Sequence, residues 1–255
     1  MKKLILATLS IIFCATITIA QMSISRIKFG IQASPTIGWV STNDTKINGN
    51  GSNIGFKLGV IADYYFNENY AISTGLGFGF NHGGKLIHDI GGNFLTKSTL
   101  TETRLNQGIK PLSDGVNIRY HINYLEVPFS LKLRTQQFGY LRYFAEAPII
   151  TLGFLTKATG DVEDPDKTKF PESPYLKENI KADVGPFAIS WGFGGGILYD
   201  ISPSTAAIAG IYFQKGIFDV AKDGVAEKVL ADGTKQAEKS KATLGNIVLR
   251  LGIIF

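Results

Sequence analysis

The stretch GFKLGVIADYYF, residues 55–66, decides the fold class, because its side chains alternate between two faces. Its even positions are apolar or aromatic throughout, from Phe56 to Phe66. Its odd positions are mostly small or charged, and they include Lys57 and Asp63. A period of two residues is that of a β-strand with one apolar face, whereas an amphipathic helix repeats about every 3.6 residues. We therefore predict a strand here.

Seven further segments share this alternation, and residues 70–80 show it most clearly after the first stretch. Most of them reach the roughly 9–11 residues that a tilted strand needs to cross a bilayer. Their connections are alternately short and long. The predicted strands span 26–41, 53–66, 70–82, 116–134, 138–156, 184–200, 204–218 and 242–255. The predicted long loops span about 42–52, 83–115, 157–183 and 219–241.

An even number of strands with alternating loop lengths is typical of an outer-membrane barrel, which has short periplasmic turns and longer external loops. The alternative is a soluble eight-stranded barrel of lipocalin type, with the apolar face turned inward. The face opposite the aromatics carries mostly glycine, alanine, serine and isolated charges, which cannot fill a dry core. With that small face inside, the aromatic face of a soluble barrel would be bare to water. We predict an all-β fold: an eight-stranded antiparallel up-and-down transmembrane β-barrel.

The first twenty residues, MKKLILATLSIIFCATITIA, have the three parts of a secretory signal peptide. A single anchoring helix is the alternative, but the small residues before Gln21 suit a signal peptidase. We predict a cleaved signal peptide over 1–20 and an outer-membrane β-barrel domain over 21–255. No later apolar run reaches the length of a membrane-spanning helix.

Composition excludes several classes of function. The single cysteine, Cys14, lies in the predicted signal peptide, so we expect no disulfide, no thiolate metal site and no nucleophilic cysteine afterwards. The formal net charge of +5 is modest, and acidic residues are mixed with basic ones. Without a basic stripe, we expect no nucleic-acid partner.

Charged residues interrupt the small face of the predicted strands. They could form a polar path for an ion or proton, or a salt-bridge network that fills the lumen. Eight strands leave room for side chains and little else, and both signs occur at similar depth, so we predict the filled lumen. The predicted network consists of Lys57, Asp63, Arg119, Glu126, Lys132, Arg142, Glu146 and Arg250.

Two predicted strands change phase. In 116–134 the apolar residues move from even to odd positions, and a one-residue slip reverses every side chain. We therefore predict a β-bulge near Tyr124–Leu125. A second bulge is predicted near Ile149–Ile150, beside Pro148, because proline cannot donate to the ladder.

The three histidines are the candidates for metal binding or catalysis. His82 and His88 lie with Asp89 in a glycine-rich segment, and two imidazoles six residues apart are a weak metal signal. We expect solvated loop residues there. His121 is expected to face inward beside Arg119, without a serine at a position suited to nucleophilic catalysis. We predict no metal, no cofactor, no catalytic residue and no enzymatic activity.

The chain ends on LGNIVLRLGIIF, residues 244–255, which alternates like a strand up to its last residue. We expect Gly245, Ile247, Leu249, Leu251, Ile253 and Phe255 to face lipid, with Asn246 and Arg250 in the lumen. The last strand must pair with the first to close a barrel, so it cannot fray. We predict that Phe255 is a C-terminal assembly signal for the barrel-assembly machinery.

The segment NYLEVPFSLKLR, residues 123–134, is similar to the signature strand of the PorT-like outer-membrane β-barrel family of Bacteroidetes. FQKGIFDV, residues 213–220, and the terminal LRLGIIF resemble that family's last two strands, and the start at Gln21 resembles exported proteins of such bacteria. The resemblance implies an outer-membrane barrel domain of the porin-like class. For PorT itself it implies a role in a gliding-associated secretion system, and it supplies no catalytic residues.

We therefore expect an outer-membrane protein with a structural or interaction role, associated with a secretion or envelope complex. The alternative is a narrow porin-like channel for small solutes or ions. The expected partners are outer-membrane lipid and lipopolysaccharide, the barrel-assembly machinery, and an envelope protein bound through the long external loops.

Overall fold

A computed structural model describes residues 26–98, 111–171, 173–220, 227–230, 232–237 and 241–255. The predicted signal peptide, residues 1–20, lies outside the described residues. In the described part of the chain, no helix is long and apolar enough to cross a membrane.

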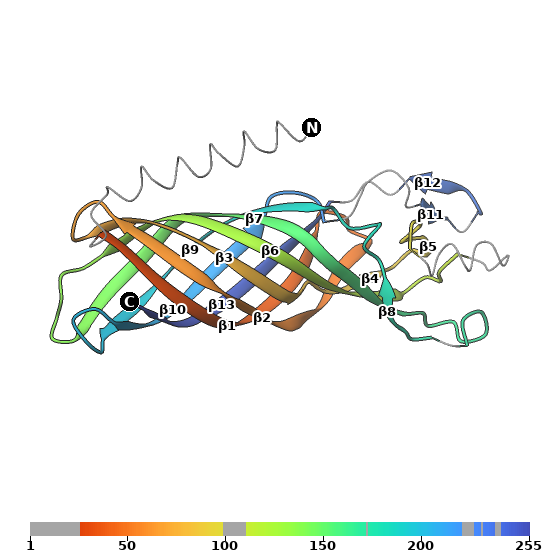
Figure 1. The fold of residues 1–255 in the computed structure, drawn as a ribbon. Coiled ribbons are helices and arrows are strands. Elements are labelled where there is room, and N and C mark those ends of the chain that lie inside the picture. The colour runs from red at the N-terminus through yellow and green to blue at the C-terminus, as the bar shows by residue number, and fades with distance from the viewer. Residues whose placement is uncertain (1–25, 99–110, 172, 221–226, 231, 238–240) are drawn as a thin grey trace, which may run out of the picture.

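Eight antiparallel strands form a closed ring, in which each strand pairs with its neighbour in the chain and the last pairs with the first (Figure 1). The predicted eight-stranded antiparallel up-and-down barrel is thus confirmed. The ring strands are β1 (Ile27–Thr42), β2 (Ile47–Tyr65), β3 (Tyr70–His82), β6 (Val116–Arg134), β7 (Leu141–Glu163), β9 (Phe187–Asp200), β10 (Ala206–Gly216) and β13 (Ala242–Ile254).

The seam between β1 and β13 closes the barrel. The Phe29 amide donates to the Phe255 carbonyl at 3.0 Å, and the Phe255 amide donates back to Phe29 at 2.7 Å. The residues of β13 alternate as predicted: Ile247, Leu249, Leu251, Ile253 and Phe255 are exposed, whereas Asn246 and Arg250 are buried. Gly245 is the exception on the outer face, because the indole of Trp39 lies against it.

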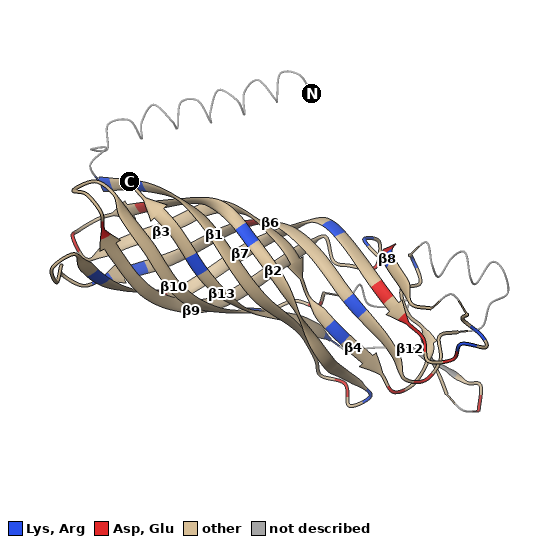
Figure 2. Ribbon diagram, turned by 90° about the horizontal axis from the view of Figure 1, so that it is seen from below, with Lys and Arg blue, Asp and Glu red and all other residues tan. Residues whose placement is uncertain are grey.

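The outer wall is an apolar surface that runs around the ring. Such a continuous patch is far larger than a soluble monomer tolerates, and lipid removes the cost. In Figure 2 the charged positions on the ring strands are isolated bands between long uncharged stretches. The exposed wall residues include Phe29, Ile31, Ile37, Phe56, Leu58, Val60, Ile72, Leu76, Phe78, Phe129, Leu131, Tyr143, Trp191, Phe193 and Ile211.

The short connections, 66–69, 135–140 and 201–205, lie at one end of the barrel together with the C-terminus (Figure 1). This is the periplasmic end by the usual rule for such barrels. At the other end, the predicted loop 42–52 is largely strand, because β1 and β2 leave only 43–46 between them. The other predicted loops contain β4 (Gly84–His88), β5 (Gly92–Asn93), β8 (Tyr175–Asn179), β11 (Glu227–Val229) and β12 (Lys235–Ala237).

The predicted bulge in the strand 116–134 is wrong, because β6 keeps one phase. Its even positions stay buried at Ile118, Ile122, Ser130 and Lys132. The apolar even residues at its outer end pack inside the external part of the barrel, which explains the pattern without a slip. A register shift does occur beside Tyr124, but the extra residues belong to the neighbouring strands β3 and β7.

The second predicted bulge is confirmed. In the pairing of β7 with β9, the register shifts between Glu146 and Ile149, where two residues of β7 face one of β9. The same shift occurs against β6, between Ser130 and Lys132. Pro148 lies in this bulge, where its missing amide hydrogen removes no regular ladder bond.

Candidate functional site in the barrel lumen

A group of buried polar side chains, the lower polar cluster, fills the lumen toward the periplasmic end. Lys132 Nζ donates to Asp63 Oδ2 at 2.6 Å and lies 3.7 Å from Glu146 Oε1. Arg250 Nη1 donates to Glu146 Oε1 at 3.0 Å and to the Tyr212 hydroxyl at 2.8 Å. The cluster consists of Asp63, Lys132, Glu146, Tyr212 and Arg250, from β2, β6, β7, β10 and β13.

This cluster crosses the lumen because the wall beside it has no side chains of its own. β9 carries Gly194, Gly195 and Gly196 at this level, and the Tyr212 ring lies where a Cβ on Gly194 would stand. The Arg250 guanidinium stacks on the same ring, with Cζ 3.9 Å from its centroid. Glycine on β9 thus makes room for a phenol, which in turn supports the ion pairs.

A second group, the middle polar cluster, lies nearer the external end. Lys57 Nζ donates at 2.8 Å both to Glu126 Oε2 and to Gln214 Oε1. The amide of Gln214 donates in turn to the Thr151 hydroxyl at 3.2 Å. His82 Nε2 lies 3.2 Å from Glu126 Oε1. The cluster consists of Lys57, His82, Glu126, Thr151 and Gln214.

Apolar side chains close the external part of the barrel above the middle polar cluster. Ile118, Ile122 and Val162 are fully buried there. A mostly apolar core of this kind is an unfavourable path for a hydrated ion. This outer apolar cluster consists of Val40, Ile47, Leu86, Phe94, Leu95, Val116, Ile118, Ile122, Tyr124, Ala158, Val162, Phe170, Tyr175, Ile180, Val184, Val220 and Leu244.

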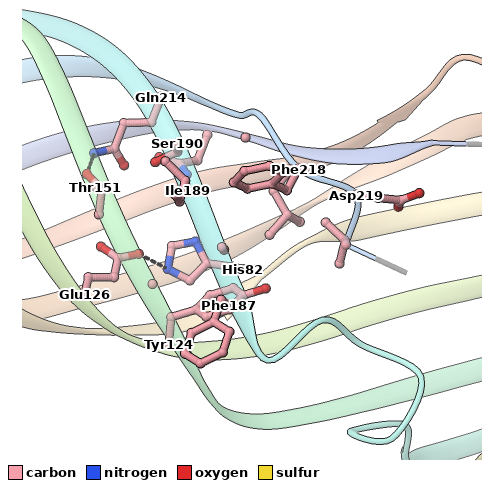
Figure 3. Close-up of a pocket in the computed structure, with 16 residues that line it drawn as sticks. His82, Tyr124, Glu126, Thr151, Phe187, Ile189, Ser190, Gln214, Phe218 and Asp219 are labelled. Carbon is pink, nitrogen blue, oxygen red and sulfur yellow. Dashed lines mark hydrogen bonds and ion pairs between the residues drawn. The ribbon is translucent and has the colours of Figure 1, made fainter. Parts of the chain in front are cut away.

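A small cavity remains between the middle polar cluster and the outer apolar cluster (Figure 3). Glu126 and His82 lie on one side of it, and Phe218 lies toward the loop after β10. The space open to the centre of a water molecule is about 40 Å³. By that measure one water needs at least about 10–15 Å³, so the cavity holds a few waters and no drug-sized ligand.

Two residues of the predicted network lie apart from these clusters. Arg119 lies in the outer part of β6, where Nη1 donates to the Asn53 side chain at 3.2 Å. Arg142 lies at the periplasmic rim, where Nη2 is 3.3 Å from Asp200 Oδ2. The structure brings together Asp63, Lys132, Glu146 and Arg250 at one level, and Lys57 with Glu126 at the next.

The expectation that His82 and His88 are solvated loop residues is wrong. His82 ends β3 and is 4% exposed, facing Glu126 of the middle polar cluster. His88 ends β4 and is 3% exposed, with its ring 4.3 Å from that of Phe94. Sequence reasoning missed His82 because a register shift in β3 between Gly79 and His82 turns this even position inward. It missed His88 because β4 continues the sheet beyond the predicted strand end. Among the described residues, no group of three or more His, Cys, Asp or Glu could hold a metal ion.

His121 does not face the lumen, since the odd positions of β6 alternate away from Ile118 and Ile122. Its Nδ1 lies 2.5 Å from Asn81 Oδ1, and its Nε2 lies 3.1 Å from Asp161 Oδ2. Both ring nitrogens are therefore engaged, and neither faces a hydroxyl that it could activate. A general base would need one nitrogen within reach of its nucleophile.

Known proteins were compared with this chain. Residues 19–214 match the family described as outer membrane protein beta-barrel domain. No curated protein matches the sequence significantly.

Three crystal structures illustrate the similarity to solved proteins. Neisserial surface protein A has 10% identity and a TM-score of 0.40, over 89% of this chain and 95% of that one. The attachment invasion locus protein Ail of Yersinia pestis has 11% identity and a TM-score of 0.36, over 90% and 97%. A major outer membrane protein from Thermus thermophilus has 13% identity and a TM-score of 0.41, over 90% and 98%.

Proposed function

The chain belongs to the family of outer membrane protein beta-barrel domains, and on this premise we propose that it acts as a closed structural and interaction component of the outer membrane. The observation that carries this proposal is the filling of the lumen at two levels. The lower polar cluster spans it with ion pairs, and the outer apolar cluster packs above. An ion would have to displace both.

The energetics support a closed lumen. Lys132 and Asp63 are fully buried, and Glu146 is almost so. Removing one member of such a pair leaves an uncompensated buried charge, so rearrangement that opens a path is costly. A hydrated pore needs the opposite arrangement, in which charged groups keep contact with water.

The external end supports an interaction role. Within the described part of the chain, β8 pairs only with β7, so its other edge presents backbone groups that a partner strand can use. Leu176 on this strand is 63% exposed. Together with the resemblance of residues 123–134 to PorT-like proteins, this edge favours an envelope or secretion complex as the setting.

The proposal includes the absence of enzymatic activity. It is supported by His121, whose two ring nitrogens already contact Asn81 and Asp161. A lipid-hydrolysis assay on the purified protein, with His121→Ala beside wild type, tests this point. Activity that disappears with the histidine would overturn it.

Planar-bilayer conductance tests closure against the alternative of a narrow channel. We expect no steady current from wild type, nor from E146A/R250A, because the outer apolar cluster remains in place. R142A/D200A removes a matched pair at the rim and serves as the control. A reproducible steady current through wild type would overturn the closed barrel in favour of the channel.

Purification from solubilised outer membranes tests the interaction role. A tagged wild-type protein should retain a stoichiometric envelope partner, and Leu176→Asp should lose it. Lys46→Gln changes another exposed external residue and should retain the partner. A partner equally bound by the Leu176 variant would place the contact elsewhere and contradict a role for the β8 edge.

A further inference from the structure

A pocket at the periplasmic rim carries a concentration of positive charge. Three of its lining residues are Arg26 and Lys28 at the start of β1, and Arg134 at the end of β6. The pocket has a volume of about 300 Å³ and opens at the end of the barrel that holds the short turns. We call it the cationic rim pocket; Tyr65, Phe66, Asn67 and Glu68 complete its lining.

The three cations lack carboxylate partners in the described part of the chain. Lys28 Nζ donates to the Ser204 carbonyl at 3.4 Å, which does not neutralise its charge. Arg134 Nε donates to the Glu68 carbonyl at 2.6 Å, so this contact does not neutralise its charge. Glu68 is the single acidic residue of the lining, against three basic ones. Elsewhere in the barrel, by contrast, Lys57, Lys132, Arg142 and Arg250 each have an acidic partner.

Two contacts orient the Arg134 side chain, and neither of them uses its terminal nitrogens. Its Cζ lies 4.0 Å from the centroid of the Tyr65 ring, a cation–π contact. Its carbonyl accepts from Asn69 Nδ2 at 2.8 Å, which ties the β2–β3 turn to the end of β6. A guanidinium fixed through its face and Nε still offers two terminal nitrogens, which suit a bidentate oxyanion such as phosphate.

One residue of the pocket lining also belongs to the exposed outer surface of the barrel. Phe66 lines the pocket and is 42% exposed, and its ring stacks with that of Tyr70, with centroids 6.1 Å apart. Aromatic rings of this kind mark the headgroup level of a membrane barrel. A molecule with an anionic head in the pocket and apolar chains along Phe66 would match both surfaces.

We propose that the cationic rim pocket binds the phosphate of an anionic phospholipid in the periplasmic leaflet of the outer membrane. Arg134 grips the phosphate oxygens, and Arg26 and Lys28 supply further charge. The acyl chains lie outside the barrel against Phe66 and Tyr70. This ligand is distinct from any partner at the external end, and it anchors the periplasmic rim at a defined height in the bilayer.

Native mass spectrometry of the detergent-solubilised barrel, titrated with phosphatidylglycerol, tests the proposal. A cation near a membrane surface contributes about five-fold to binding, so we expect R26Q, K28Q or R134Q to weaken it by about five-fold each. The triple variant should lose roughly 100-fold if these contributions add. Phosphatidylcholine and glycerol 3-phosphate should both bind more weakly than phosphatidylglycerol.

The matched control is K46Q/K157Q/K177Q, which removes three exposed lysines on the external side. It should bind phosphatidylglycerol like wild type. Unchanged binding by the triple rim variant, or an equal loss in the control, would overturn the site. Equal binding of phosphatidylcholine would overturn the need for an anionic lipid, and equal binding of glycerol 3-phosphate would replace the lipid by a soluble phosphate. Heat-modifiable mobility in gel electrophoresis shows whether each variant is folded. If the triple variant does not fold, the binding of the three single variants tests the proposal.

Discussion

Lys132 Nζ lies 2.6 Å from Asp63 Oδ2 inside the barrel, and neither side chain is exposed to solvent. The two residues come from β6 and β2, which are separated in the ring by β3. Ser73 of that intervening strand donates its hydroxyl to Asp63 Oδ1 at 2.6 Å. The pair therefore joins three consecutive strands through the lumen, in addition to their backbone ladders.

Breaking this pair should strongly destabilise the barrel. Lys132→Met leaves Asp63 buried without its cation, and such losses cost about 3–5 kcal/mol. Urea unfolding in lipid vesicles, followed by tryptophan fluorescence, measures the change. The comparison substitution Arg142→Gln breaks a partly exposed rim pair and should cost no more than about 1 kcal/mol. Equal losses of unfolding free energy from the two substitutions would contradict a larger contribution of the buried pair to stability.

A methyl group on Gly194 should disturb the lower polar cluster. The Tyr212 ring occupies the place of that methyl group, so Gly194→Ala must displace the phenol from Glu146 and Arg250. Overpacking of this kind costs about 1–3 kcal/mol, measured by the same unfolding experiment. Gly185→Ala is the control, because the nearest atom to its added methyl group, the Asp219 carbonyl oxygen, is 3.6 Å away, an ordinary contact. Similar losses at both glycines would rule out the ring contact as the cause.

Loss of the last residue should impair assembly. Deleting Phe255 removes both backbone hydrogen bonds to Phe29, worth about 0.5–1.5 kcal/mol each, at the closing seam. Phe255→Ala keeps these bonds and removes only the ring. If the ring is the assembly signal, both variants should yield less heat-modifiable barrel in outer-membrane fractions. If only the deletion fails, seam closure alone accounts for the effect, and normal assembly of both would refute the prediction.

The loop after β7 should stay ordered in mild acid. Hydrogen bonds from Thr168 and the Lys169 side chain lower the pKa of Asp166 to about 2. Because the folded pKa is depressed, the stabilisation is present above the usual Asp value and is lost as the pH falls toward 2. A carboxyl-resolved NMR titration should show Thr168→Val raising this pKa. Thr234→Val alters the similar contact at Asp232 and should leave Asp166 unchanged.

Period-two alternation predicted the ring because each strand has one lipid face and one lumen face, and the bilayer makes that contrast sharp. It failed at the external end, where the pattern of β6 is reversed: the apolar residues face inward and the outward odd positions are polar, as at Arg119 and His121. Ile118 and Ile122 pack inside the protein there, so the apolar face marks the interior and no longer the lipid side. The false bulge and the inward placement of Arg119 and His121 follow from this one reversal.

The sequence also could not predict which of the lumen charges pair with each other. Alternation placed Lys57, Asp63 and Glu146 on the inner face, but their levels depend on the register between strands. The bulge at Pro148 shifts that register and sets Glu146 beside Arg250 rather than elsewhere along β13. Likewise, the sequence did not mark Tyr212 as a member of the network. Its place in the lumen depends on the room that the glycines of β9 leave for its ring.

The length of β7 determines how far the barrel extends on the external side of the membrane. It runs for 23 residues from the periplasmic rim, whereas β10 has 11. At roughly 3.3 Å per residue and a tilt of about 40°, β7 rises roughly 58 Å, although the lipid-facing band of such barrels is only about 25 Å tall. About 30 Å of β7 therefore extends beyond the lipid-facing band on the external side. Macromolecules can therefore contact the loops at its tip without entering the apolar layer of the membrane.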